Sequence, residues 1–178
     1  VPNTQLGQLL GCALSTAPGG ASALQVDTLQ ATSVPGVYAA GECTGFGGAE
    51  RALAQGKVAG LAATQQFQAA QQVWPERARW EGFATQLHRH FALSGVLREL
   101  PRADTVVCRC EDVLHGTLSQ CGDWTDAKLR SRCGMGACQG RVCGAAAEFL
   151  YSWRAPAPRP PLSPARISTL IGASDPAP

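Results

Sequence analysis

Hydrophobic and polar positions in the first third of the chain predict a strand, a turn and a helix. Residues 24–27 alternate as a short strand does, and residues 37–40 form a brief apolar run typical of a buried strand. Between them, residues 32–36 place a proline and a glycine as a type II turn requires. Small and apolar side chains then recur at helical spacing, at Ala49, Ala52, Leu53, Gly56, Ala59, Gly60 and Ala63. This pattern is compatible with ordinary helix–sheet packing, and equally with a cofactor at the glycine-rich strand–helix turn.

The middle of the chain predicts a helix between two modules. Residues 64–76 are polar and glutamine-rich, which indicates an exposed helix end or a linker. His88 and His90 would point in different directions on the helix that follows, so we favour surface or capping roles over metal binding. We expect the next module to begin around residues 100–104. The predicted apolar face of this helix carries Trp80, Phe83, Ala84, Leu87 and Phe91.

Three short helices are expected in the last module. Residues 113–119 predict the first, and residues 123–132 predict the second, with Asp123 or Thr125 as its N-cap. The third would follow the last cysteine. Its apolar face would carry Val142, Ala145, Ala146, Phe149 and Leu150.

Six of the eight cysteines fall between residues 107 and 143. Extended backbone at Cys108 and Cys110 would turn both thiols to the same side, toward one metal centre. Cys138 and Cys143 are five residues apart, which on a regular helix means about 140° of rotation. We therefore expect Cys138 on the glycine-rich turn that precedes the helix, and Cys143 near the helix's first turn.

Composition limits the kinds of site that these cysteines are expected to form. The chain has 178 residues, 45% of them hydrophobic and 16% charged, with a net charge of +2, too small to favour nucleic acid or an anionic membrane as partner. No apolar run reaches the ~18 residues of a membrane span. A disulfide framework is less favoured than a metal centre in a reducing cytoplasm, because small secreted scaffolds are shorter and richer in cysteine. Four cysteines suit an iron–sulfur cluster, and four-cysteine zinc remains the alternative.

The segment TSVPGVYAAGECTGFGGAERALAQGKVAG resembles the second FAD-contacting segment of the flavoproteins with two dinucleotide-binding domains. The resemblance implies that Glu42 bonds a ribityl hydroxyl, although most relatives have Asp there, and that Gly41 allows the cofactor to approach. It also implies that Gly47, Gly48 and Ala49, at the start of the following helix, face the flavin. The G-x-G-x-x-G adenosine-binding pattern does not occur in the chain. We therefore expect a C-terminal portion of a longer flavoprotein, which needs the missing N-terminal half to hold FAD.

The segments CRCEDV and AKLRSRCGMGACQGRVCG resemble the bacterioferritin-associated-ferredoxin-like (BFD-like) [2Fe-2S] domain, in the version fused behind FAD domains. Together with the FAD-like segment, the resemblance covers about residues 28–150. It implies the cluster ligands Cys108, Cys110, Cys138 and Cys143. Cys133 could replace Cys138, whereas buried thiols are expected at Cys12, Cys43 and Cys121.

These resemblances predict an α/β fold, the C-terminal part of an FAD-binding Rossmann-like domain, followed by a small, mainly α [2Fe-2S] domain. The expected divisions are an FAD/NAD(P)-binding segment at residues 1–72, a helical linker at 73–103, the BFD-like domain at 104–154 and a proline-rich tail at 155–178. The combination is similar to electron-transfer subunits of opine oxidase, hydrogen cyanide synthase and hydroxyproline dehydrogenase.

The family resemblance implies a cytoplasmic oxidoreductase chain that passes electrons between FAD and the cluster in amino-acid, opine or imino-acid oxidation. The expected partner is a catalytic, amino-acid-oxidase-like flavoprotein subunit in a hetero-oligomer, and no catalytic residue is assigned to this chain. The alternative function is a regulatory or docking module with structural zinc or a non-catalytic cluster.

Overall fold

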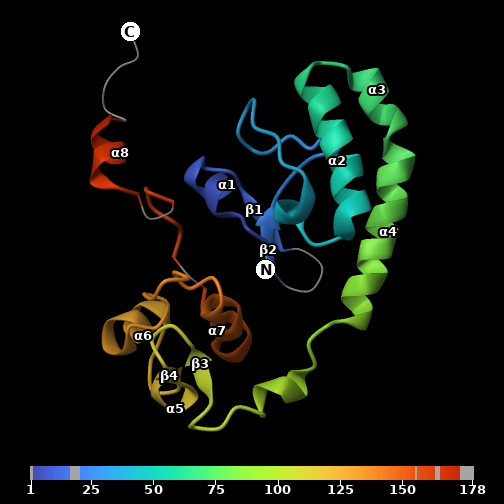
Figure 1. Cartoon of the computed structure of the whole chain (residues 1–178). Helices are drawn as coiled ribbons and strands as arrows, with labels where there is room; N and C mark the ends of the chain where they lie inside the picture. The colour runs from blue at the N-terminus through green and yellow to red at the C-terminus, as the bar shows by residue number, and fades with distance from the viewer. Residues whose placement is uncertain (1, 17–20, 155, 163–164, 173–178) are drawn as a thin grey trace. The chain divides into compact units, whose positions relative to one another are not determined.

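A computed structural model of the chain describes residues 2–16, 21–154, 156–162 and 165–172. The chain divides into two units (Figure 1). The first runs to Phe91 and includes the chain from Ala157 onward, and the second is Ala92–Pro156. Across the described residues, no helix combines the length and the apolar character needed to cross a membrane.

The first unit opens with helix α1 (Gln5–Leu9) and an antiparallel pair of short strands. Strands β1 (Leu14–Thr16) and β2 (Ser22–Leu24) pair with Leu14 opposite Leu24. Leu24 packs so closely against Gly7 of α1 that a Cβ at Gly7 would lie 2.4 Å from its Cδ2. The small core of this part is formed by Leu24, Cys12 and Ala39.

The turn predicted at residues 32–36 is confirmed. The amide of Val37 donates to the carbonyl of Val34 at 3.1 Å, and Gly36 has φ +77°, as position i+2 of a type II turn requires. The buried strand predicted at residues 37–40 is wrong: the structure has a single bridge between Ala31 and Tyr38. A longer ladder does not form there, because among the described residues only the short segment on the other side of the turn is placed to pair with residues 37–40.

The remaining elements described in the first unit are helices. The 3₁₀ helix η1 (Gly41–Thr44) leads into α2 (Gly48–Ala63), then α3 (Phe67–Gln72) and α4 (Trp74–His90), and α4 folds back beside α2 (Figure 1). Helix α2 is confirmed, but its buried face is not the predicted one. The buried side chains of α2 are Ala54, Gln55, Val58 and Ala62.

The predicted small-residue stripe of α2 lies mostly on the opposite face, where Leu53 is 64% exposed. Helix α4 is also confirmed, yet only Ala84 of its predicted apolar face is fully buried, and Phe91 is 77% exposed. The predicted exposed segment at residues 64–76 instead contains α3, whose Ala70 is buried. Helix α8 (Ile167–Gly172) lies in the C-terminal part of this unit.

The second unit begins with the 3₁₀ helix η2 (Gly95–Arg98) and two paired strands. Strand β3 (Val106–Cys108) pairs with β4 (Val113–Leu114) across an irregular register. The helix predicted at residues 113–119 therefore starts later than expected, as α5 (His115–Leu118). Helices α6 (Trp124–Ser131) and α7 (Cys143–Tyr151) complete the unit, and the predicted cap Asp123 accepts a hydrogen bond from the amide of Asp126 at 2.7 Å.

One hydrophobic core holds the second unit together. Three of its members are cysteines, so the core and the candidate metal centre are built from the same side chains. The predicted apolar face of α7 is rotated, since Val142 is exposed whereas Cys143 and Ala147 are buried. The buried core residues are Val107, Cys108, Val113, Leu118, Trp124, Ala127, Cys133, Cys143 and Ala147.

Candidate functional site

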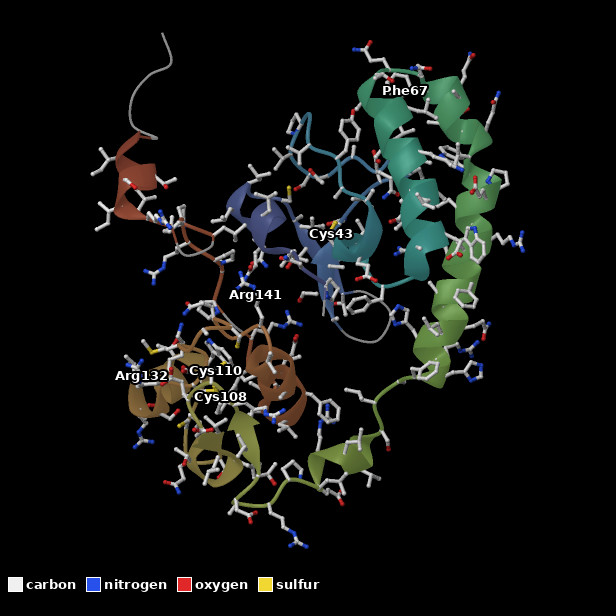
Figure 2. All side chains as sticks on the ribbon, in the orientation of Figure 1. Cys43, Phe67, Cys108, Cys110, Arg132 and Arg141 are labelled. Atoms are coloured by element: carbon white, nitrogen blue, oxygen red, sulfur yellow. The ribbon has the colours of Figure 1, made fainter. Side chains whose placement is uncertain are left out.

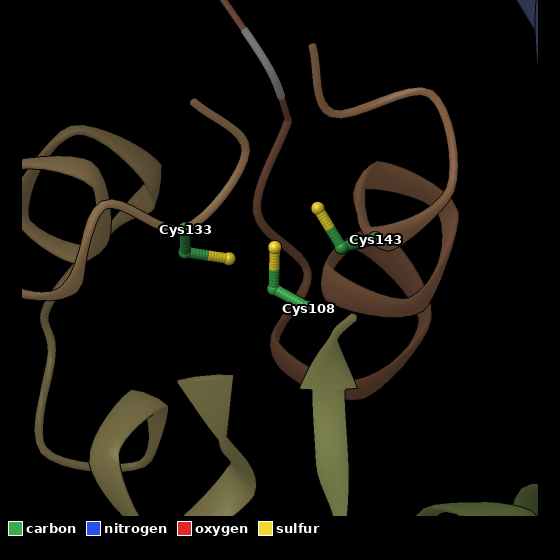
Figure 3. Close-up of side chains that lie close together, drawn as sticks. All are labelled: Cys108, Cys133 and Cys143. Atoms are coloured by element: carbon green, nitrogen blue, oxygen red, sulfur yellow. The ribbon is translucent and has the colours of Figure 1, made fainter. Parts of the chain in front are cut away.

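Three cysteines of the second unit converge in its core (Figure 3). Cys108 ends β3, Cys133 lies in the turn after α6, and Cys143 is the first residue of α7. Each is only 1% exposed, and their Sγ atoms all lie within 4.8 Å of one another. Thiolates that bind one metal tetrahedrally at about 2.3 Å are about 3.8 Å apart. The trio could therefore hold a thiophilic metal ion after a small inward movement.

Two further thiols, those of Cys110 and Cys138, interact with each other at the exposed side of the unit. Cys138 lies on the turn before α7 and Cys143 starts that helix, as predicted. Extended backbone through Cys110 is wrong, because β3 ends at Cys108 and a turn follows. The structure thus brings the four predicted ligands into one region, together with Cys133, the predicted alternative to Cys138.

Hydrogen bonds and burial shift the pKa values of Cys110 and Cys138, the outer pair of thiols, in opposite directions. The backbone amide of Val142 is the main reason that the pKa of Cys138 is lowered. A hydrogen bond with the backbone of Cys138 lowers the pKa of Cys110, but the bond to the Cys138 thiol, desolvation and nearby thiolate charges outweigh it. The pKa of Cys110 is therefore raised, and Cys138 ionises first.

In the buried trio, Cys133 and Cys143 share a hydrogen bond. This bond lowers the pKa of Cys133 and raises the pKa of Cys143, to which burial also contributes. Cys133 therefore ionises before Cys143 in the metal-free chain. Binding a metal through Cys143 would release the proton of its thiol, because the ligand is the thiolate.

A glycine-rich loop fits closely around the cysteines. Gly134 and Gly140 both have positive φ values, +76° and +78°, and both lie against the indole of the buried Trp124. A Cβ at Gly136 would lie 2.3 Å from the Cβ of Cys110. The glycines of the GMGACQG segment thus allow Trp124 and Cys110 to approach the loop backbone.

Basic side chains near the centre are partly neutralised. The Nε atom of Arg132 lies 2.8 Å from Oε2 of Glu111, and Nη1 of Arg130 lies 3.7 Å from Oδ2 of Asp126. The Arg132–Glu111 pair joins the end of α6 to the turn that carries Cys110. Figure 2 shows Cys108, Cys110 and Arg132 in the second unit. The arginine's exposure keeps its contribution to stability small.

The predicted flavin-contacting residues occupy the turn that precedes α2. Gly41 has φ +82° and starts η1, and its amide donates to Oε1 of the buried Gln55 at 2.8 Å. Glu42 is exposed on η1, and the exposed Gly48 and Ala49 begin α2.

Gly47 is the one buried residue among the predicted flavin contacts. It precedes α2, and a Cβ there would lie 2.1 Å from Cδ of Arg51. Glu42 is thus exposed six residues before the exposed start of a long helix, and a carboxylate and a helix N-terminus suit the hydroxyl and phosphate groups of a dinucleotide.

Sequence reasoning missed the residues that support this turn. Gln55 also accepts a hydrogen bond from the hydroxyl of Thr44 at 3.0 Å, which fastens η1 to α2. Arg51 donates to the carbonyl of Gly45 at 2.6 Å and lines a pocket of about 120 Å³ with Glu81 and His88. The sequence shows Gln55 only as a polar residue among small and apolar ones in the predicted helix. That pattern does not indicate a role for Gln55 until the fold is known.

Comparison with known proteins gives these two regions a family context. The protein-family model described as Glucose inhibited division protein A matches residues 20–71, which include η1 and α2. Hydrogen cyanide synthase subunit HcnB of Pseudomonas aeruginosa is 33% identical over 157 residues, covering 80% of this chain and 34% of the relative. The A subunit of opine oxidase from Rhizobium meliloti is 34% identical over 155 residues, covering 81% and 34%. The chain is related to the C-terminal part of FAD-dependent oxidoreductase subunits.

The relationship confirms the resemblance to FAD-dependent oxidoreductases drawn from the sequence, while the fused [2Fe-2S] domain stays a prediction. The HcnB of Pseudomonas protegens is also similar, with 31% identity over 160 residues. The chain spans about a third of the length of these curated relatives, whose matched lengths are 34% in each case. No solved structure matches the chain significantly.

Proposed function

We propose that this chain is the electron-transfer part of a flavin- and iron–sulfur-dependent oxidoreductase subunit. Electrons would pass between FAD and a [2Fe-2S] cluster during the oxidation of an amino acid, an opine or an imino acid. The observation that carries the proposal is the convergence of five cysteine thiols in the second unit, in a chain whose relatives are oxidoreductase subunits. A cluster supplies one-electron chemistry, and the protein's part is to hold and tune it.

The arrangement of the thiols supports four cluster ligands in two pairs. A [2Fe-2S] cluster takes two cysteines on each iron. Cys108 and Cys143 form a buried pair, and Cys110 and Cys138 form an outer pair that interacts with it. We assign these four residues as the ligands. The outer pair would then place one iron near the surface, where electrons can enter or leave.

The exposed turn at Glu42, with the start of α2, supports a flavin contact. We assign Gly41, Glu42, Gly47, Gly48 and Ala49 to it. Glu42 would accept a hydrogen bond from a ribityl hydroxyl, and the amides of α2 would face the dinucleotide. The relatives' names, as subunits, support a hetero-oligomer, and we propose a catalytic, amino-acid-oxidase-like flavoprotein as the partner, in the cytoplasm.

Ligand variants test the cluster assignment. The chain purified without oxygen is expected to show visible absorption that bleaches with dithionite. Cys138→Ser should lose this absorption and its iron. Cys121→Ser is the matched control and should keep both, because Cys121 lies at the edge of the core and bonds the carbonyl of Thr117. A Cys138→Ser protein that retains a full cluster would refute the ligand set.

A second candidate is a docking or regulatory module with structural zinc. It is favoured by one observation, because three buried thiols within 4.8 Å of one another also suit a single tetrahedral ion. A colourless protein with one equivalent of zinc and no acid-labile sulfide would support this candidate and exclude the first.

A further inference from the structure

The ion pair between Glu111 and Arg132 joins the two parts of the chain that supply the cysteines of the centre. Glu111 follows Cys110 in the turn after β3, and Arg132 precedes Cys133 at the end of α6. Their side chains meet across 21 residues of sequence, with Nε of Arg132 2.8 Å from Oε2 of Glu111. The pair therefore links the turn that carries Cys110 to the segment that leads to Cys138.

The carboxylate of this pair is largely enclosed. The side chain of Glu111 is 19% exposed, whereas that of Arg132 is 66% exposed. The second carboxylate oxygen, Oε1 of Glu111, lies against the glycine-rich loop, because a Cβ at Gly136 would be 3.1 Å from it. Glu111 thus contacts the arginine with one oxygen and the loop with the other. Such a carboxylate is held in a more fixed position than one in a pair of two fully exposed side chains.

The backbone at Arg132 indicates that its side chain has a use. Arg132 ends α6 in the left-handed conformation, with φ 63°. Glycine and asparagine are the usual residues in this conformation at helix ends, because other side chains adopt it at a cost. An arginine here combines that cost with a long, charged side chain that reaches Glu111. Backbone strain of this kind is retained where the residue serves a site.

We propose that Arg132 and Glu111 are positioning residues that hold the Cys110 turn against the loop carrying Cys138, and so slow the loss of the metal from the centre. This rests on the proposed function, which makes that metal a [2Fe-2S] cluster. Cys110 is exposed and Cys138 is partly exposed, so a chelator reaches the metal from the side of these two thiols. For the metal to leave, the turn and the loop must separate, and that separation breaks the ion pair.

The test measures loss of the cluster from the full 178-residue chain to EDTA without oxygen, followed by the decay of its visible absorption. Arg132→Gln and Glu111→Gln each remove the ion pair, and each should release the cluster about threefold faster than the wild type. The variant with both changes should be no faster than the faster single variant, because the same interaction is lost only once. The single changes alter the net charge in opposite directions, so a general electrostatic effect on the anionic cluster would shift the two rates in opposite directions.

Two control variants separate the ion pair from its surroundings. Arg130→Gln removes another exposed arginine of α6, with its 3.7 Å contact to Asp126, and should release the cluster at the wild-type rate. Asp123→Ala removes the cap of α6 and leaves the ion pair in place, so it should also release at the wild-type rate. The first control tests for a general effect of charge, and the second tests for a general effect of helix stability.

Several results would overturn the inference and leave the proposed function standing. These are an unchanged rate in either single variant, rates that shift in opposite directions, and additive effects in the double variant. Equal acceleration in Arg130→Gln or in Asp123→Ala would also overturn it. A wild type without iron would instead overturn the proposed function. The same variants would then be compared in the zinc form, by transfer of zinc to the dye 4-(2-pyridylazo)resorcinol, with the same results expected.

Discussion

Replacing Gly136 by alanine should disrupt the metal centre more than it disrupts the fold. The new Cβ would lie 2.3 Å from Cβ of Cys110 and 3.4 Å from its carbonyl carbon, whereas carbon atoms in contact are about 3.5–4.0 Å apart. These two Cys110 atoms are a backbone atom and the first side-chain atom, which cannot swing aside as the nearby end of the Glu111 side chain can. The loop and the Cys110 turn must therefore separate by roughly 1.2 Å or more.

Overpacking of this kind costs about 1–3 kcal/mol of unfolding free energy. The same displacement moves Cys110 away from Cys138, so metal binding should fall further than stability does. Urea unfolding followed by circular dichroism measures the first effect, and iron content after anaerobic reconstitution measures the second. Gly122→Ala is the matched control, because no atom lies within 4 Å of its added Cβ. Equal stability and equal iron content in the two variants would refute the close approach of the loop to Cys110.

Four further predictions follow from individual contacts. Asp123→Ala removes the N-cap of α6 and should lower the unfolding free energy by about 1 kcal/mol in urea, whereas Asp123→Asn should lose far less. Gln55→Ala leaves the amide of η1 without its buried acceptor, and should cost about 1–3 kcal/mol by the same assay; an unchanged midpoint would contradict this. Gly82→Ala, inside α4 with open space around it, should raise thermal stability by about 0.5–1 kcal/mol, and destabilisation would mean that the position is covered. In metal-free protein, alkylation of Cys138 should begin at lower pH than that of Cys110, since a lowered pKa yields thiolate earlier and a raised one later; mass spectrometry after a short pulse decides the order.

Local patterns in the sequence predicted the parts of the fold that depend on neighbouring residues. The type II turn before Val37, the start of α2 after the glycines and the cap at Asp123 are all set within a few residues. The placement of Cys138 on a turn and Cys143 at a helix start followed from helix geometry alone. These features needed no knowledge of what packs against them.

Features that depend on distant partners were not predicted. The apolar run at residues 37–40 predicts a buried strand. A strand forms only where another strand pairs with it, and the described residues provide a single bridge at Tyr38. The buried face of α2 was misjudged because it is determined by the packing of η1, α3 and α4 against this helix, which the pattern within α2 does not reveal. Cys133 was expected only as a replacement for Cys138, whereas the end of α6 at Arg132 turns it into the core beside Cys108 and Cys143.

The central claim is that the second unit holds a [2Fe-2S] cluster on cysteine thiolates, and metal and sulfide analysis of the purified chain tests it most directly. Protein prepared without oxygen should contain iron and acid-labile sulfide in equal amounts, two of each per chain, with little zinc, and its visible absorption should bleach on reduction. One zinc per chain, no labile sulfide and no colour would contradict the claim.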